Sequence, residues 1–146
     1  MSIHTACIDA CFDLAMESRG EGGLPIGSVL ARGDKIIGRG HNRRVQQGNP
    51  ILHGEMDALR DAGRQESYRD TVLYTSLSPC MMCAGTIVQF KIPRVVICEN
   101  LNFGGNEQFL IERGVTVEVL NEQRFVDMMA RFIEEQPALW DEDIAE

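Results

Sequence analysis

Four residues in two short segments have the types and spacing to hold and use a metal ion. His53-Gly54-Glu55 forms an H-x-E triplet, and Cys80 and Cys83 follow downstream in a P-C-x-x-C segment. Zinc prefers thiolate and imidazole ligands, and catalytic zinc sites use three protein ligands with a fourth position for water. The chain has no second C-x-x-C and no H-x-x-x-H to close the shell. His53, Cys80 and Cys83 therefore predict an open, catalytic Zn²⁺ site.

Glu55 is the predicted catalytic acid and base beside that metal. It lies two residues after His53, and on the first turn of a helix its carboxylate can approach the fourth zinc position without binding the ion. Zinc lowers the pKa of a water ligand towards ~7, and a neighbouring carboxylate can move that proton to a ring nitrogen and a leaving amine. The H-x-E and P-C-x-x-C pair is a known signature of zinc deaminases. Hydrolytic deamination of an amidine-like carbon is the expected chemistry, and the alternative is a structural zinc or two buried cysteines.

The elements that position these residues are expected from apolar periodicity and turn residues. The predicted helices cover residues 3–18, 52–62, 80–90, 109–113 and 122–135, and the predicted strands cover 26–32, 35–40, 71–75, 94–98 and 115–120. Residues 42–50 are expected to form a polar loop, and residues 137–146 receive no element. One strand hairpin followed by βα alternation predicts a single domain over residues 1–146, an α/β fold with a mixed five-stranded sheet in a three-layer α/β/α sandwich.

Composition narrows the class of substrate. The chain has 146 residues and a net charge of −8, from 14 basic and 22 acidic side chains. Nucleic-acid binders usually carry basic patches, so a small neutral substrate is favoured over a polyanion. No apolar run reaches the ~18 residues of a membrane span, and the N-terminus lacks the pattern of a signal peptide. We therefore expect a soluble cytoplasmic protein that binds neither nucleic acid nor membrane.

The remaining histidines and cysteines have simpler explanations. His4, Cys7 and Cys11 lie at helical spacing, and small apolar cysteines on a core face are favoured over a second metal site. Cys98, at the end of a buried strand, is interpreted in the same way, and His41 is interpreted as structural.

Several segments resemble the fungal-type cytosine deaminases, within the cytidine-deaminase-like superfamily, over almost the whole chain. They are GGLPIGSVL at 22–30, GRGHNRR at 38–44, LHGEM at 52–56, LYTSLSPCMMC at 73–83, IPRVVICENLNF at 92–103 and LWDEDIAE at 139–146. The resemblance implies a homodimer that deaminates a small free base, with cytosine as the leading substrate. The segment after Phe103, from Gly104 to Glu107, looks shorter than in the fungal proteins.

The resemblance also implies a set of substrate-binding residues. Asn42 and the backbone N–H of Gly54 would hydrogen-bond the polar edge of a flat ring, and the carbonyl of Ser78 and the carboxylate of Asp143 would meet its amino side. The residues expected to cover or line the ring are Phe103, Trp140, Ile144, Ile26 and Leu77. Aromatic neighbours suit a planar ring, and a tail carrying Trp140 would exclude water and leave no room for a ribose.

Three alternatives remain open at this stage. The same zinc chemistry could act on guanine, creatinine, isocytosine or another small amino-heterocycle. A tRNA-adenosine deaminase would share both metal motifs, although the acidic end of the chain argues against it. A non-enzymatic zinc module is disfavoured by the missing fourth ligand.

Overall fold

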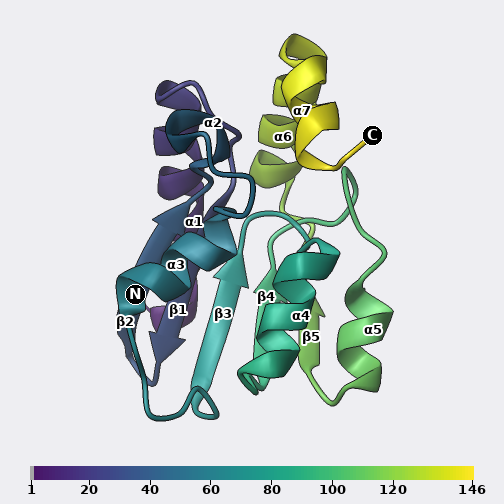
Figure 1. Ribbon diagram of the computed structural model, residues 1–146. Coiled ribbons are helices and arrows are strands. Elements are labelled where there is room, and N and C mark those ends of the chain that lie inside the picture. The colour runs from purple at the N-terminus through teal and green to yellow at the C-terminus, as the bar shows by residue number, and fades with distance from the viewer. Residues whose placement is uncertain (1) are drawn as a thin grey trace.

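The computed structural model describes residues 2–146, which fold around a mixed five-stranded sheet of order β2-β1-β3-β4-β5 (Figure 1). The strands are β1 (Gly27–Arg32), β2 (Lys35–His41), β3 (Thr71–Thr75), β4 (Arg94–Ile97) and β5 (Thr116–Val119). β1 pairs antiparallel with both β2 and β3, whereas β3, β4 and β5 are parallel. The predicted α/β fold with a mixed five-stranded sheet is confirmed.

Helices cover both faces of this sheet, because alternate strand residues point to opposite sides. On one face α1 (Ile3–Gly20) and α6 (Gln123–Glu135) enclose a core that includes Val29 and Ala31 of β1. On the other face α3 (Gly54–Ala62), α4 (Met81–Gln89) and α5 (Glu107–Glu112) pack over a second core that includes Leu30. The three layers of the sandwich follow directly from this alternation.

α1 is the longest helix, with 18 residues, and its buried side confirms the interpretation of its cysteines. Cys7 and Cys11 are fully buried in the same core as Cys98. His4 lies at the edge of that core, with Nδ1 3.0 Å from the hydroxyl of Tyr74. Among residues 2–146, none of the helices has both the length and the apolar character that crossing a membrane requires.

Two short helices lie where the sequence predicted none. α2 (Arg44–Gln47) interrupts the expected polar loop at 42–50, and it ends at Gly48, whose φ of 57° is left-handed. α7 (Pro137–Asp143) occupies the tail, with proline at its first position, where the missing N–H costs nothing. α2 buries no side chain and α7 buries only Trp140, so neither carries the apolar stripe that reveals longer helices. The other predicted elements are confirmed, with ends shifted by a few residues.

One end of the sheet gathers the segments that carry the candidate site. β3 and β4 finish there, and β1 begins there because Ser28 pairs with Thr75 in antiparallel register. β2 also finishes at this end, since His41 pairs with Gly27. In Figure 1 the head of the β3 arrow marks this end, with α7 lying beyond it. Ligands of open α/β sheets bind at the carboxyl ends of the strands, so this end is the expected place for a site.

Candidate metal centre and active site

His53, Cys80 and Cys83 come together at the starts of two helices. His53 is the residue immediately before α3, Cys80 is the residue immediately before α4, and Cys83 lies in the first turn of α4. His53 Nδ1 is 3.5 Å from the sulfur of Cys80 and 3.9 Å from that of Cys83. In a tetrahedral zinc site with ordinary bond lengths, nitrogen and sulfur ligands are roughly 3.6 Å apart. The three donors therefore fit one zinc ion without rearrangement.

The two metal-site cysteines differ in proton affinity. A hydrogen bond from the Cys83 thiol lowers the pKa of Cys80 to about 4, against the opposing effect of burial. The bond to the Cys80 sulfur, together with burial, raises the pKa of Cys83 well above its usual value. The backbone N–H of Cys83 also donates to the Cys80 sulfur at 3.5 Å, and the positive end of a helix favours a thiolate there. One sulfur is thus already ionised, and a zinc ion would displace the proton held by the other.

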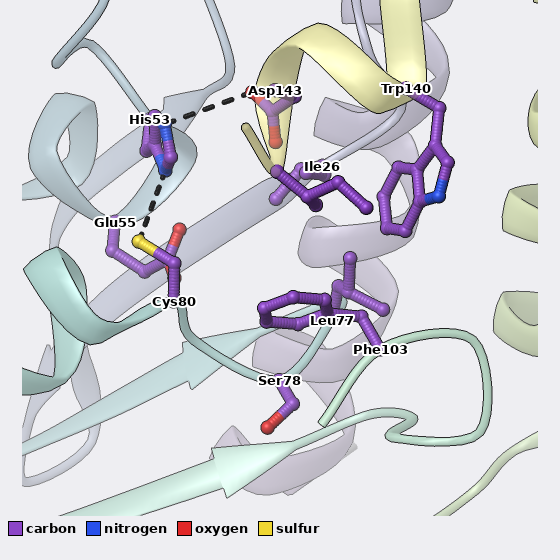
Figure 2. A pocket seen from close by; sticks show the side chains of 10 residues that line it. Ile26, His53, Glu55, Leu77, Ser78, Cys80, Phe103, Trp140 and Asp143 are labelled. Atoms are coloured by element: carbon purple, nitrogen blue, oxygen red, sulfur yellow. Dashed lines mark hydrogen bonds and ion pairs between the residues drawn. The ribbon is translucent and has the colours of Figure 1, made fainter. Parts of the chain in front are cut away.

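The carboxylate of Asp143 lies on the far side of the His53 imidazole. His53 Nδ1 faces the sulfur of Cys80, while Nε2 lies 3.7 Å from Asp143 Oδ1 (Figure 2). Burial raises the pKa of Asp143, while His53 and a hydrogen bond from Asn42 Nδ2 at 3.3 Å oppose that shift. Metal-binding histidines commonly direct their second nitrogen at a carboxylate, which fixes the tautomer and ring orientation. Asp143 therefore lies on the Nε2 side of the ring, while Nδ1 faces the two sulfurs.

Glu55 has the proton affinity expected of a group that exchanges protons near neutral pH. Its side chain lies in the first turn of α3, and the residue is only 5% exposed. Burial, and then the charge of Cys80, raise the pKa of Glu55 to about 7, while His53 acts in the opposite direction. A catalytic acid or base works best when its pKa lies near the working pH. Glu55 is thus both placed and tuned for proton transfer beside the metal centre.

The pocket over this centre has one polar and one apolar side (Figure 2). Its lining residues are Ile26, His53, Glu55, Leu77, Ser78, Cys80, Phe103, Trp140, Asp143 and Ile144. Phe103 and Trp140 meet edge to face with ring centroids 6.1 Å apart. The structure thus brings together seven of the nine residues that the sequence suggested for substrate binding.

Asn42 and Gly54 lie behind the pocket wall rather than on it. Asn42 is fully buried, and its side-chain oxygen accepts a hydrogen bond from the backbone N–H of Arg44 while its nitrogen bonds Asp143. A Cβ on Gly54 would lie 3.1 Å from the carbonyl oxygen of Ile26, so the start of α3 packs closely against the residue that precedes β1. Their direct contact with a substrate stays a prediction.

Three charged residues that the sequence did not single out shape this pocket. Glu99 is fully buried and accepts hydrogen bonds from the backbone of residues 101 and 102, which fixes the loop that carries Phe103. Glu107 accepts from the Ser78 hydroxyl and from the backbone N–H of residue 105. Arg44 binds Glu142 of α7 at 2.6 Å. Of these, only Glu99 has a sequence signal, a carboxylate directly after a buried strand.

α7 forms one wall of the pocket, which is narrow and partly open to solvent in this structure. Trp140, Asp143 and Ile144 form one wall, and they all belong to α7 or directly follow it. A planar base in the pocket would therefore lie against α7.

Comparison with known proteins agrees with this site. Residues 1–99 match the family described as the cytidine and deoxycytidylate deaminase zinc-binding region. The chain is similar to the cytosine deaminase of Candida albicans, with 50% identity over 142 residues that cover 95% of both chains. It is also similar to the tRNA-specific adenosine deaminase of Streptococcus pyogenes serotype M18, with 42% identity over 86 residues that cover 56% of this chain and 54% of the relative.

Solved structures show the same fold at low identity. The guanine deaminase from Nitrosomonas europaea superposes with a TM-score of 0.78 and 19% identity, covering 90% of this chain and 85% of its own. A tRNA:A34 deaminase superposes with a TM-score of 0.71 and 24% identity, covering 80% of this chain and 98% of its own. These two likenesses support the fold and leave the substrate to the site itself.

Proposed function

This chain belongs to the family of cytidine and deoxycytidylate deaminases with a zinc-binding region, and we propose that it hydrolyses cytosine to uracil and ammonia. The observation that carries the proposal is the combination of three zinc-binding side chains with Glu55 in a pocket that α7 lines on one side. The match to a cytosine deaminase extends over 95% of the chain. The match to a tRNA-specific adenosine deaminase covers only 56% of it.

In the proposed reaction, Glu55 carries the protons. A zinc ion held by His53, Cys80 and Cys83 would lower the pKa of a water molecule and so supply a nucleophile at neutral pH. Glu55 accepts the proton of the water that attacks C4 of the ring and delivers it to N3. It then takes the proton of the new C4 hydroxyl and passes it to the amino group, so that C4 becomes a carbonyl as the C4–N bond breaks and ammonia leaves. Because its pKa is about 7, Glu55 can accept and return a proton at similar cost.

The other pocket residues are proposed to hold the base. Phe103 and Trp140 offer apolar faces to the ring, and the Asp143 carboxylate is available to the exocyclic amine. Asn42 steadies Asp143 through its side-chain amide and offers a donor and an acceptor to the base edge once α7 shifts. The net charge of −8 supports a neutral base over a nucleic acid.

We also propose that the chain forms a homodimer. α4 exposes Met81, and Phe90 at the end of that helix is 47% exposed. Both side chains are candidates for a subunit contact, because burial of exposed apolar surface favours association.

An ammonia-release assay over a panel of substrates tests the proposed function. The panel contains cytosine, cytidine, guanine, creatinine, isocytosine and a tRNA anticodon stem, each incubated with the zinc-loaded protein. We expect the highest kcat/KM with cytosine, and little turnover of cytidine because the narrow pocket leaves no room for a ribose. Preferred turnover of another heterocycle would be consistent with zinc-dependent deamination but would reject cytosine as the main substrate. Turnover of the tRNA stem alone would indicate a tRNA-adenosine deaminase instead.

Deleting residues 139–146 should reduce kcat/KM for cytosine by at least ~100-fold, because misplacing a bound substrate by about 1 Å costs that much. The deletion removes Trp140, Asp143 and Ile144 from the pocket while leaving all three zinc-binding side chains. Steady-state kinetics with zinc analysis makes the measurement. As the control, Asp141→Asn changes an exposed carboxylate of α7 that does not line the pocket, and it should change kcat/KM by less than ~5-fold. Unchanged turnover in the deletion would show that α7 only packs against the domain.

A further inference from the structure

A second cluster of metal-binding side chains lies where α1 ends and β2 ends. His41 Nε2 is 3.5 Å from a carboxylate oxygen of Glu21 and 3.9 Å from one of Glu17. In a tetrahedral site with zinc bonds near 2.0 Å, such nitrogen and oxygen ligands are about 3.3 Å apart. The three donor atoms all lie within 4.8 Å of one another, close to the spacing of a metal shell.

His41 points a buried nitrogen at these carboxylates. The residue is 1% exposed, and within residues 2–146 its Nε2 has no hydrogen-bond partner. Its other nitrogen, Nδ1, lies 3.1 Å from the carbonyl oxygen of Asn42 and must carry the proton, because a carbonyl only accepts. If Nε2 carries no proton, its lone pair faces two carboxylates, and a cation between them would remove the repulsion. The alternative is that Nε2 carries a second proton. A histidine whose N–H is fixed by a backbone carbonyl is the usual arrangement of a metal ligand.

The local electrostatics also favour a cation at this position. Glu17 lies in the last turn of α1 and Glu21 directly follows it, at the negative end of the helix dipole where carboxylates are disfavoured. The nearby cation, Arg43, already donates to Asp57 at 2.8 Å. Gln46 donates at 3.3 Å to Glu21 Oε1, the same oxygen that lies 3.5 Å from His41 Nε2, and a carboxylate oxygen has a second lone pair that can bind an ion. The side chains of Glu17 and Glu21 are 58% and 42% exposed, so an ion can enter from solvent.

We propose that His41, Glu17 and Glu21 form a second metal site, which takes a divalent transition ion such as Zn²⁺ or Mn²⁺ with water at its remaining positions. One imidazole and two carboxylates suit such ions better than they suit soft ions such as Cu(I), which prefer thiolate ligands. The ion would join the end of α1 to the end of β2, next to Asn42, whose side chain holds Asp143. The site is separate from His53, Cys80 and Cys83, and its existence does not depend on the proposed function.

Metal titration of protein that already holds one tightly bound zinc tests this site. Calorimetry with Zn²⁺, and separately with Mn²⁺, should reveal one further equivalent of metal per chain. Mn²⁺ binds most N, O and S sites more weakly than Zn²⁺, so it should leave the zinc at the cysteines in place. Bound Mn²⁺, which is paramagnetic, should broaden the imidazole NMR signals of His41 more than those of His4. Saturating zinc should raise the melting temperature by about 5–10 °C at 100-fold excess over Kd.

The matched variants carry equal changes of charge. Glu17→Gln with Glu21→Gln removes two ligands that are largely exposed, so the fold should remain intact, and affinity for the second equivalent should fall at least ~100-fold. Glu66→Gln with Glu134→Gln changes two exposed carboxylates outside the cluster and should bind like the parent chain. If the parent protein binds no second equivalent of metal, a proton rather than a metal ion lies between His41 and the carboxylates, and the proposal fails. The proposal also fails if the second equivalent survives the Glu17 and Glu21 changes.

Discussion

Glu55→Gln is expected to keep zinc and to lose turnover of cytosine by a factor of ~10²–10⁴ or more, the usual contribution of a positioned acid or base. Glutamine matches the shape of glutamate but cannot accept and return a proton. Glu55 is buried beside the metal centre with a pKa raised to about 7 by burial, and its removal leaves the three zinc-binding side chains untouched. The loss should therefore appear in kcat rather than in metal content.

The measurement pairs single-turnover kinetics with elemental analysis of the same preparation. Glu55→Asp is the matched control, because it keeps a carboxylate but withdraws it by one methylene, and its rate should fall between those of the parent and the glutamine variant. A glutamine variant as active as the parent would remove Glu55 from the mechanism.

Cys83→Ala is expected to abolish both the tightly held zinc and the turnover. Two ligands remain, and an open site that loses one of its three protein ligands no longer retains the ion. Cys83 is fully buried, so part of any loss of stability will come from packing rather than from the metal. Cys98→Ala separates the two effects, because Cys98 is equally buried and lies in the opposite core.

Thermal melting with and without a chelator distinguishes these variants. The parent and Cys98→Ala should melt at lower temperature when the chelator removes zinc, because an ion that binds only the folded state stabilises it. Cys83→Ala should already have the lower melting temperature, and the chelator should not change it. Retention of tightly bound zinc and activity in Cys83→Ala would contradict the assigned metal centre. Gel filtration in the presence of a weak chelator should first remove any metal ion bound at the weaker second site. The zinc content then reports only the tightly bound ion.

The local parts of this site could be predicted from the sequence because they depend on short spacing. Cys80 and Cys83 share one helical turn, and His53 and Glu55 share another, so periodicity places each pair correctly. The mixed five-stranded sheet followed in the same way, because one hairpin followed by βα alternation leaves few topologies, whereas the order of its strands was not predicted.

The rest depends on contacts between distant segments. Asp143 meets His53 only because α7 folds back over the end of the sheet, across 90 positions of sequence. α2 and α7 were missed because their few turns carry no apolar stripe, and α7 owes its place to Trp140 and to pairs such as Arg44 with Glu142. The cluster of His41 with Glu17 and Glu21 likewise joins a helix end to a strand end, and no short motif marks it.

The most direct test of the central claim follows the conversion of cytosine by protein stripped of metal and then reloaded with one equivalent of zinc. Uracil and ammonia should form in equal amounts, only after zinc is restored, and the rate should track zinc occupancy. Formation of uracil at the full rate by the stripped protein, or none by the zinc-loaded protein, would contradict the assignment of His53, Cys80, Cys83 and Glu55 as the catalytic centre of a cytosine deaminase.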